Sequence, residues 1–390
     1  MFAHLQIAHT RERTLVGLAD VALAPFGWRR VTPPPRPVRR ILLLRLERIG
    51  DLLMTLEAFE DARRFWPAGE IDLAVGSWNA PVASLVPDIS RIELVDVPWL
   101  AREGRGDSWP SLMAKAHAWR EREYDLVINF EPDIRSNWLA WLSGASRRVG
   151  YASGGGGALL TDAGVYDTSL HVSDNARRLV ARAADHPPAG PHDWTTSRAR
   201  LDLPADAVAR AHAALGQASR PLVGIHASGG RESKQWHLDR FAAVARALAD
   251  ARGATIVLTG TAADRPLIDR VKRNLGGLTV IDVAGLLDLP ALAALLAELD
   301  VFVTSDTGPM HLAAAVGTPI AALFGPSHPH RYGPRAERQR ILRVDLPCSP
   351  CGQVRLPPAR CRGHVPDCMD GIRVETVVAA ALELLETGRA

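Results

Sequence analysis

Short apolar runs alternate with stretches of helical periodicity along most of this chain. In the first half, four runs predict buried strands: ILLLRL (41–46), IDLAV (71–75), IELVDV (92–97) and DLVINF (125–130). The helical stretches between them include one from about residue 51 to residue 66. Strands that alternate with helices at this spacing are typical of a parallel sheet that is covered on both faces.

The second half repeats this rhythm. PLVGIHA (221–227), ATIVLTG (254–260), VIDVAG, VFVTSD and PIAALFG predict strands, and the spacing of apolar residues predicts a helix over 236–251. LAALLAEL, the segment from Pro309 and the segment at about 374–387 predict further helices. The predicted fold class is therefore α/β, with two tandem Rossmann-like, doubly wound domains. Ligands of such sheets bind beyond the carboxyl ends of the strands, and we expect them in the cleft between the two domains.

These patterns divide the chain into five parts. Residues 1–38 form an N-terminal extension, in which a weak helix over 1–28 precedes a linker whose prolines prevent helix formation. The four later parts are a first domain at 39–190, an interdomain linker at 191–219, a second domain at 220–372 that includes a cysteine segment at 348–368, and a C-terminal helix at 373–390.

The composition is that of an ordinary globular protein. Hydrophobic residues make up 47% and charged residues 23% of the 390 residues, which excludes a disordered, collagen-like or coiled-coil chain. The net charge of +3 is too small for a protein that mainly coats nucleic acid, so no nucleic-acid partner is expected. No stretch approaches ~18 uninterrupted apolar residues and the N-terminus lacks a secretory signal, so we expect a cytoplasmic protein.

Two further segments have ordinary interpretations beside functional ones. The basic segment from Arg29 to Arg48 is either a solvated linker or a contact with an anionic membrane, which would make the protein peripheral on the inner membrane face. The SGGGG run (153–157) is interpreted as a flexible turn, because no helix-opening pattern follows it.

Neither a G-x-G-x-x-G motif after the first strand nor a P-loop motif is present in the sequence. Their absence argues against an enzyme with the dinucleotide-binding fingerprint and against a P-loop NTPase.

The segment RLERIGDLLMTLEAF (45–59) contains the candidate catalytic group. A strand ends here, a glycine turn follows, and a helix opens at about Asp51. A carboxylate at the tip of the first strand can accept a proton from a substrate hydroxyl. The alternative is that Asp51 only caps or begins the helix and so stabilises the fold.

The segment HASGGRESKQWHLDRF (226–241) follows the first strand of the second domain. Ser228, Gly229 and Gly230 allow a tight turn whose N–H groups can hold phosphate oxygens. Lys234 adds a compact positive charge, and it is one of only three lysines among 46 basic residues. The alternative is an ordinary surface lysine on a loop that leads into a helix.

The segment TSDTGPMHLAAAVGTPIAALFGPS (304–327) is the most specific local signal in the chain. Asp306 ends a strand, and Thr307–Pro309 opens a helix whose first N–H groups and positive dipole end can meet an anion. His311 lies in the first turn of that helix, within reach of such an anion. A lone histidine is usually structural, but one beside Asp-Thr-Gly at a strand–helix junction is less often so.

All four cysteines lie in one C-terminal segment, Cys348-x2-Cys351-x9-Cys361-x6-Cys368. The C-x2-C pair has the spacing of a tetrahedral thiolate site, and four thiolates suit a structural zinc or iron that would hold a loop poor in apolar residues. Disulfide or redox pairing and plain thiols are the alternatives.

Together these segments resemble glycosyltransferase family 9, the bacterial heptosyltransferase family of lipopolysaccharide core assembly. The resemblance runs from about Arg40 to the C-terminus and rests on RLERIGDLLMT, DLVINFEPDIRSNWLAWLSGASRRVGY (125–151), SGGRESKQW, the 304–327 segment and the cysteine segment. It implies a GT-B fold in which the second domain holds most of the nucleotide sugar. It also implies an inverting transfer of heptose, or a related sugar, from an ADP-sugar to a hydroxyl of a glycan, lipid-linked or protein acceptor, with no catalytic metal.

The resemblance also assigns roles residue by residue. Asp51 matches the catalytic aspartate, Lys234 matches the lysine that contacts the donor phosphates, and Asp264 lies near an acidic ribose contact. With the 228–230 turn and the nucleotide-diphosphate motif, the predicted donor-binding residues are Ser228, Gly229, Gly230, Lys234, Asp264, Asp306, Thr307, Gly308 and His311. Some relatives hold iron on a four-cysteine motif, so a metal stays among the predictions for Cys348, Cys351, Cys361 and Cys368.

Three departures concern the acceptor side. The family often has proline where this chain has Glu57, it usually has Trp-Pro where this chain has Trp236-His237, and the 1–37 extension has no counterpart. Transfer to a secondary metabolite or a protein is therefore an alternative. So are an epimerase of the same fold and a non-catalytic nucleotide-sugar-binding subunit that assembles into an oligomer through its cysteine segment.

Overall fold

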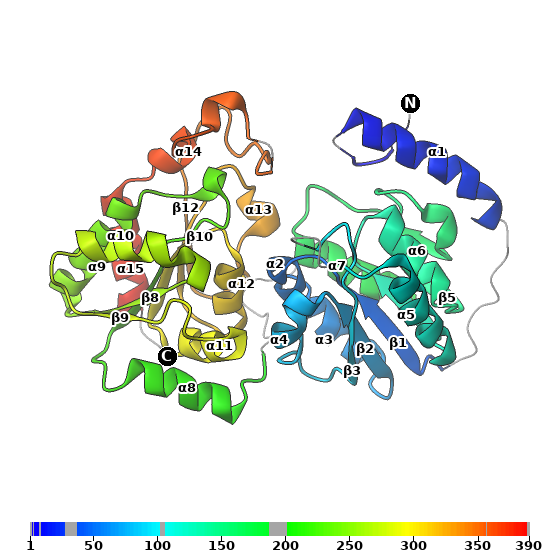
Figure 1. The fold of residues 1–390 in the computed structure, drawn as a ribbon, viewed down its shortest axis with the longest axis horizontal. Coiled ribbons are helices and arrows are strands. Elements are labelled where there is room, and N and C mark those ends of the chain that lie inside the picture. The colour runs from blue at the N-terminus through cyan, green and yellow to red at the C-terminus, as the bar shows by residue number, and fades with distance from the viewer. Residues whose placement is uncertain are drawn as a thin grey trace. The chain divides into compact units, whose positions relative to one another are not determined.

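The computed structural model describes residues 2, 4–7, 9–27, 37–101, 106–186, 201–355 and 357–387. The chain forms two compact units, unit 1 from Met1 to His192 and unit 2 from Asp193 to Ala390. Each unit contains a six-stranded sheet in which all neighbouring strands are parallel (Figure 1). The predicted α/β class with two doubly wound sheets is confirmed.

The sheet of unit 1 has the strand order β3-β2-β1-β4-β5-β6. One of its two central strands is apolar from Ile41 to Leu44, and these four residues are completely buried because helices cover both faces. Its strands are β1 (Arg40–Leu44), β2 (Glu70–Val75), β3 (Arg91–Leu94), β4 (Leu126–Asn129), β5 (Arg147–Tyr151) and β6 (Asp162–Gly164).

The helices of unit 1 pack on these two faces. Leu42, Leu44 and Val127 share a core with Leu112 of α5 and Leu139 of α6. Side chains alternate along a strand, so Ile41 and Leu43 point to the opposite face, where α3 and α7 lie side by side. The helices are α1 (Thr10–Gly27), α2 (Ile49–Leu53), α3 (Leu56–Phe65), α4 (Ala80–Ala83), α5 (Trp109–Glu121), α6 (Ile134–Leu142) and α7 (Val172–Ala183).

The sheet of unit 2 repeats this arrangement with the strand order β12-β11-β10-β7-β8-β9. The central strands β7 and β10 are buried at every position. Its strands are β7 (Leu222–His226), β8 (Thr255–Thr259), β9 (Val280–Asp282), β10 (Val301–Ser305), β11 (Ile320–Leu323) and β12 (Gln339–Leu342).

One face of this second sheet is covered by α9, α10 and α15, which share the main core of unit 2 with the strands. The helices α8, α11 and α12 form a second group, in which α11 packs against both others. The helices are α8 (Ala205–Leu215), α9 (Leu238–Arg252), α10 (Arg265–Asn274), α11 (Leu289–Glu298), α12 (Gly308–Ala315), α13 (Pro329–Tyr332), α14 (Asp367–Asp370) and α15 (Val374–Glu386).

Several elements differ from the sequence-based expectation. The helix expected over 51–66 is two helices, α2 and α3, which are separated at Met54 and Thr55. The stretch 191–219 contains α8, since its alanine-rich sequence favours a helix and Arg210 pairs with Asp288 at the start of α11. The Pro/Arg-rich residues 28–36 and residues 187–200 lie outside the described part of the chain.

The SGGGG loop is held in place by the N-terminal helix. Asp20 of α1 accepts a hydrogen bond from the N–H of Gly156 at 2.5 Å, and Gln6 N–H donates to the carbonyl of Ser153 at 2.7 Å. A Cβ at Gly155 would lie 2.3 Å from Val16, so a residue with a side chain does not fit there. The run is thus a packing site for α1.

None of the helices built from described residues combines the length and apolarity needed to cross a membrane.

Candidate functional site

The donor-side residues of unit 2 gather at the carboxyl ends of β7, β8 and β10. These are adjacent parallel strands, so the loops that follow them meet at one edge of the sheet. The loop after β7 contains Ser228 and Lys234, the loop after β8 contains Asp264, and Asp306 follows β10 directly. The structure therefore brings together residues that are up to 78 positions apart in the sequence.

Lys234 is anchored to Asp306 in the described structure. Its Nζ donates to the carbonyl oxygen of Asp306 at 2.5 Å and lies 3.2 Å from the Asp306 carboxylate. Both side chains are largely buried, with exposed fractions of 17% and 12%. The lysine is therefore a fixed charge at the sheet edge rather than a mobile surface residue.

The glycine turn before Lys234 is tightly packed. Gly230 has a positive φ of 65°, and a Cβ at Gly229 would lie 2.6 Å from the backbone nitrogen of Gln235. The N–H of Gly229 donates to Gln235 Oε1 at 2.8 Å, and the N–H of Gly230 donates to Ser228 Oγ at 3.3 Å. Both N–H groups predicted to hold phosphate are thus engaged within the loop, and a phosphate would have to replace these bonds.

Asp264 joins the loops after β7 and β8. It accepts hydrogen bonds from the N–H and hydroxyl of Thr261 at 2.8 and 2.6 Å, and it also bonds to the side chain of Ser228. Burial opposes ionisation, but these hydrogen bonds outweigh it and lower the pKa of Asp264 below its ordinary value. The nearby His226 is fully buried on β7, and burial lowers its pKa to about 4. The site thus offers an ionised carboxylate beside a neutral imidazole.

The helix α12 begins at this same edge. Its N-cap residue Thr307 makes no side-chain cap hydrogen bond, and the Thr307 hydroxyl instead lies 3.2 Å from the Thr304 hydroxyl. Pro309 stands in the first turn, as predicted, and His311 in the second half of that turn is buried. The start of α12 therefore keeps the positive dipole end that suits an anion.

In unit 1, Asp51 lies in the first turn of the short helix α2, close to the carboxyl end of β1. Its Oδ2 accepts a hydrogen bond from the N–H of Arg48 at 3.2 Å, so the capping role is present in the structure. Its Oδ1 lies 3.9 Å from Arg45 Nη2, and the side chain is 30% exposed. One carboxylate oxygen therefore caps the helix while the other is held only by a longer ion pair.

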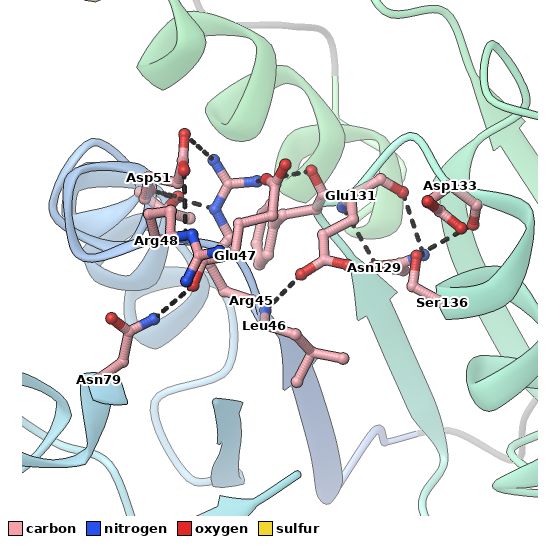
Figure 2. Close-up of polar contacts among 12 residues, drawn as sticks. Arg45, Leu46, Glu47, Arg48, Asp51, Asn79, Asn129, Glu131, Asp133 and Ser136 are labelled. Carbon is pink, nitrogen blue, oxygen red and sulfur yellow. Dashed lines mark hydrogen bonds and ion pairs between the residues drawn. The ribbon is translucent and has the colours of Figure 1, made fainter. Parts of the chain in front are cut away.

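A buried ionic cluster that sequence analysis did not identify surrounds this aspartate (Figure 2). The Arg45 side chain is almost fully buried and donates to the Asp51 carbonyl at 3.1 Å, to Glu47 Oε2 at 2.8 Å and to the Phe130 carbonyl at 2.9 Å. Burial alone would lower the pKa of Arg45, but Glu47, Asp51 and Glu131 outweigh it and raise it. Arg45 thus stays charged and connects the loop after β1 to the end of β4.

Glu131 is the acidic member of this cluster on the β4 side. It is 2% exposed, and its carboxylate accepts a hydrogen bond from the N–H of Leu46. Burial and the nearby Glu47 raise its pKa well above the ordinary glutamate value. The signal in the sequence was a charged residue directly after the buried strand DLVINF, but only the parallel pairing of β1 with β4 shows its partner.

The four cysteines are not arranged as a metal centre in the described structure, so metal binding by them stays a prediction. All four are free, Cys348 and Cys351 are exposed, and Cys368 is buried. The pKa of Cys368 is raised to about 11, mainly by burial and partly by the other three thiols. Among the described residues, which include all four cysteines, no group of His, Cys, Asp or Glu side chains is arranged to hold a metal ion. A metal at these cysteines is therefore assigned no chemical step.

The cysteine segment nevertheless contacts the donor-side loops of unit 2. Ser233 Oγ donates to the Val354 carbonyl at 3.1 Å, and Gly352 N–H donates to the Pro326 carbonyl at 2.8 Å. Ser349 Oγ donates to the Gly325 carbonyl at 2.8 Å. The segment therefore holds the loops after β7 and β11 in place, a role that sequence spacing did not suggest.

Comparison with known proteins decides the family. The family model of glycosyltransferase family 9 (heptosyltransferase) matches residues 113–357, which is more than half of the chain. The chain belongs to glycosyltransferase family 9. Lipopolysaccharide heptosyltransferase 1 of Pseudomonas aeruginosa is 30% identical to this glycosyltransferase over 326 residues, which are 80% of this chain and 86% of the relative.

Solved structures agree on the fold of this family 9 protein. The Escherichia coli ADP-heptose lipopolysaccharide heptosyltransferase II covers 89% of this chain and 99% of its own, with a TM-score of 0.71 and 21% identity. A family 9 glycosyltransferase from Veillonella parvula covers 90% of this chain and 98% of its own, with a TM-score of 0.75 and 23% identity. These structures confirm the GT-B-like fold, and the family match and the 30% identical relative confirm the resemblance and the glycosyltransferase activity class.

Proposed function

We propose that this glycosyltransferase moves heptose from ADP-heptose to a hydroxyl group of a lipopolysaccharide-type acceptor, with inversion at the anomeric carbon. Its relatives include a lipopolysaccharide heptosyltransferase and an ADP-heptose lipopolysaccharide heptosyltransferase. The observation that carries the proposal for this chain is the gathering of Ser228, Lys234, Asp264 and Asp306 beside the N-terminus of α12. A buried lysine and a helix N-terminus suit a diphosphate, and a carboxylate suits ribose hydroxyls.

The proposed reaction is a single displacement. Asp51 accepts the proton of the acceptor hydroxyl, whose oxygen forms the new bond to the anomeric carbon as the bond to the diphosphate breaks. The departing ADP gains negative charge, which Lys234 and the first turn of α12 stabilise electrostatically. These groups supply positive charge without a metal ion, so we propose metal-independent chemistry. The proposed location is the cytoplasm, with peripheral contact to the inner membrane face through the arginines of residues 29–40, because Arg45 is buried in the core.

The first test is transfer itself. The purified protein is incubated with ADP-heptose and heptose-free lipopolysaccharide, and ADP release and the anomeric configuration of the product are measured. We expect transfer with inversion at an unchanged rate in EDTA. A retained anomeric configuration, or a rate abolished by EDTA and restored by a divalent metal, would contradict the proposal. The donor is identified by the shift in melting temperature that each member of a panel of nucleotide sugars causes. A shift only with a sugar linked to a nucleotide other than ADP would show that ADP-heptose is not the donor.

Asp51→Asn separates the two roles of this residue. Asparagine keeps an oxygen that can accept the Arg48 N–H, so the helix cap is preserved, but it cannot take up a proton. We expect kcat to fall by about 10²–10⁴-fold, the usual contribution of a general base, while ADP binding is nearly unchanged. Near-wild-type turnover would show that Asp51 is not the base.

Lys234→Ala tests the donor diphosphate contact. Loss of the ammonium removes positive charge from the predicted phosphate site and leaves Asp306 without its partner. We expect a higher KM for the donor, a lower kcat and a smaller melting-temperature shift with ADP. The exposed Lys272, which pairs with Asp282 on β9, provides the matched control, because Lys272→Ala should leave all three quantities unchanged. If the two variants had the same donor KM, kcat and ADP-induced melting-temperature shift, Lys234 would not be a donor-binding residue.

A further inference from the structure

Three tryptophans from three different elements meet on the surface of unit 1. Trp99 follows β3, Trp109 begins α5, and Trp138 lies on α6. The ring centroids of Trp99 and Trp109 are 6.4 Å apart, and those of Trp109 and Trp138 are 5.8 Å apart. Trp99 and Trp138 pack on the core, whereas Trp109 is 54% exposed. We call these three residues the aromatic platform.

A fixed ion pair borders the aromatic platform. The Arg135 guanidinium lies 4.8 Å from the centroid of the Trp99 ring, in cation–π contact. It is held by Asp133 through two hydrogen bonds of 2.9 and 2.6 Å, and Asp133 also accepts the N–H that begins α6. Because both groups are anchored and partly exposed, they present a donor and an acceptor at defined positions beside the aromatic rings.

The aromatic platform adjoins the cluster that holds Asp51. Asp133 lies two residues after Glu131, at the end of β4, and Figure 2 shows it on the side of the cluster opposite Asp51. Glu131 interacts electrostatically with both Asp133 and Arg135, and also with Arg45, which lies beside Asp51. The carboxyl ends of β1, β3 and β4 lie at one edge of the same sheet. A ligand on the platform would therefore lie at the same edge of the sheet as Asp51, across the cluster from it.

The chemistry of this surface matches a sugar ring. One face of a pyranose is made of C–H groups that pack on an indole, and the hydroxyls at its rim bond to fixed charged groups. An exposed aromatic patch bordered by polar groups marks a binding site. A membrane is a poorer match, because the Arg135–Asp133 pair beside the rings carries no net charge that would attract anionic headgroups.

We propose that the aromatic platform binds a pyranose ring of the acceptor glycan and so presents its hydroxyl to Asp51. This inference rests on the proposed function and adds the acceptor-binding residues to it. Trp109 is the stacking residue, and Arg135 and Asp133 fix the rotation of the ring through its hydroxyls.

The test compares Trp109→Ala with Trp109→Phe and with Trp66→Ala, a control that truncates a partly buried tryptophan at the opposite edge of the sheet, before β2. The probe is heptose-free lipopolysaccharide whose acyl chains have been removed. We measure the KM for this acceptor, kcat, the KM for ADP-heptose, and acceptor binding by calorimetry. For Trp109→Ala we expect a rise of about ten-fold or more in acceptor KM and Kd, as for an aromatic anchor, with the donor KM unchanged. Trp109→Phe keeps a ring and should recover most of the affinity.

Each other outcome has a defined meaning. An unchanged acceptor KM and Kd in Trp109→Ala, or an equal rise in Trp66→Ala, overturns the platform. If Trp109→Ala loses binding to phosphatidylglycerol vesicles while its acceptor binding is unchanged, the platform binds a lipid surface rather than a sugar. If the wild-type protein transfers no heptose but binds the deacylated acceptor through Trp109, the proposed reaction fails and the platform stands. If it transfers heptose and Trp109→Ala does so equally well, only the platform fails.

Discussion

Arg45 determines how the candidate base of unit 1 is held. It is buried among Asp51, Glu47 and the end of β4, and it makes four polar contacts there. A buried guanidinium is unfavourable unless charged and hydrogen-bonded partners surround it, and each of its contacts therefore constrains the others. The cluster that positions Asp51 therefore forms only when β1 and β4 pair.

The acidic side of this cluster yields a pH prediction. The pKa of Glu131 is raised on folding, so its contribution to stability is full below the ordinary glutamate pKa and is lost as pH rises through the folded pKa. Glu131→Gln removes this titration and keeps an oxygen for the Leu46 N–H. We therefore expect the free energy of unfolding of the variant, relative to wild type, to increase as pH rises from the ordinary glutamate pKa to the raised pKa of the folded state.

Urea unfolding at several pH values measures this difference. Glu123→Gln is the control, because that side chain is 83% exposed and its substitution leaves the buried cluster intact. A difference for Glu131→Gln that is flat, or that decreases as pH rises, would show that this carboxyl is ionised as readily as an exposed one.

At the scale of elements, the cysteine segment and the donor-side loops form one structural group. Within the loop after β7, Gln235 accepts a hydrogen bond from the N–H of Gly229. The loop is also tied to the cysteine segment, because the Ser233 hydroxyl donates to the Val354 carbonyl. The segment also bonds to the Gly325 and Pro326 carbonyls after β11. Hydrogen bonds to loops that lack a regular ladder hold those loops in one conformation, and here they set the position of Lys234.

Ser233→Ala tests this coupling. The substitution removes the bond to the Val354 carbonyl without touching the substrate-binding residues. One neutral hydrogen bond contributes about 0.5–1.5 kcal/mol, so we expect the donor KM to rise by about 2–10-fold with little change in the acceptor KM. The exposed Ser219→Ala is the matched control. A donor KM equal to that of the control would show that the cysteine segment does not position the donor loop.

At the scale of the whole molecule, the two units have separate cores. The core around Val223, Phe241 and Val377 belongs to unit 2, and the core around Leu42, Leu112 and Leu139 belongs to unit 1. The predicted nucleotide-binding groups all lie in unit 2. Binding energy from ADP should therefore stabilise the fold of unit 2 directly.

Hydrogen exchange with and without ADP measures this. At an ADP concentration 100 times its Kd, we expect core amides of β7 and β10 to gain about 2.7 kcal/mol of protection, a factor of about 100 in exchange rate. Amides of β1 and β4 should exchange as before. Protection confined to unit 1, or no gain in unit 2, would contradict the assignment of the nucleotide to unit 2.

The sequence by itself determined the fold class and the position of most site residues along the chain. Continuous apolar runs such as ILLLRL and VFVTSD predict strands that are buried on both faces, and β1 and β10 are such strands. Parallel strands place the residues that follow them at one edge, so Asp51 and Asp306 could be located from order alone. The motifs that carry these residues were sufficient to identify the family.

Only the tertiary structure decided which groups are partners. Arg45 and Glu131 are 86 residues apart in sequence, and their contact depends on strand pairing that no local pattern encodes. The same is true of Lys234 with Asp306 and of the three tryptophans of the aromatic platform. The cysteines are a further example: their spacing predicts a metal site, but only the path of the loop decides that two thiols are exposed and one is buried. Spacing limits which side chains can meet, whereas packing and hydrogen bonding determine which of them do.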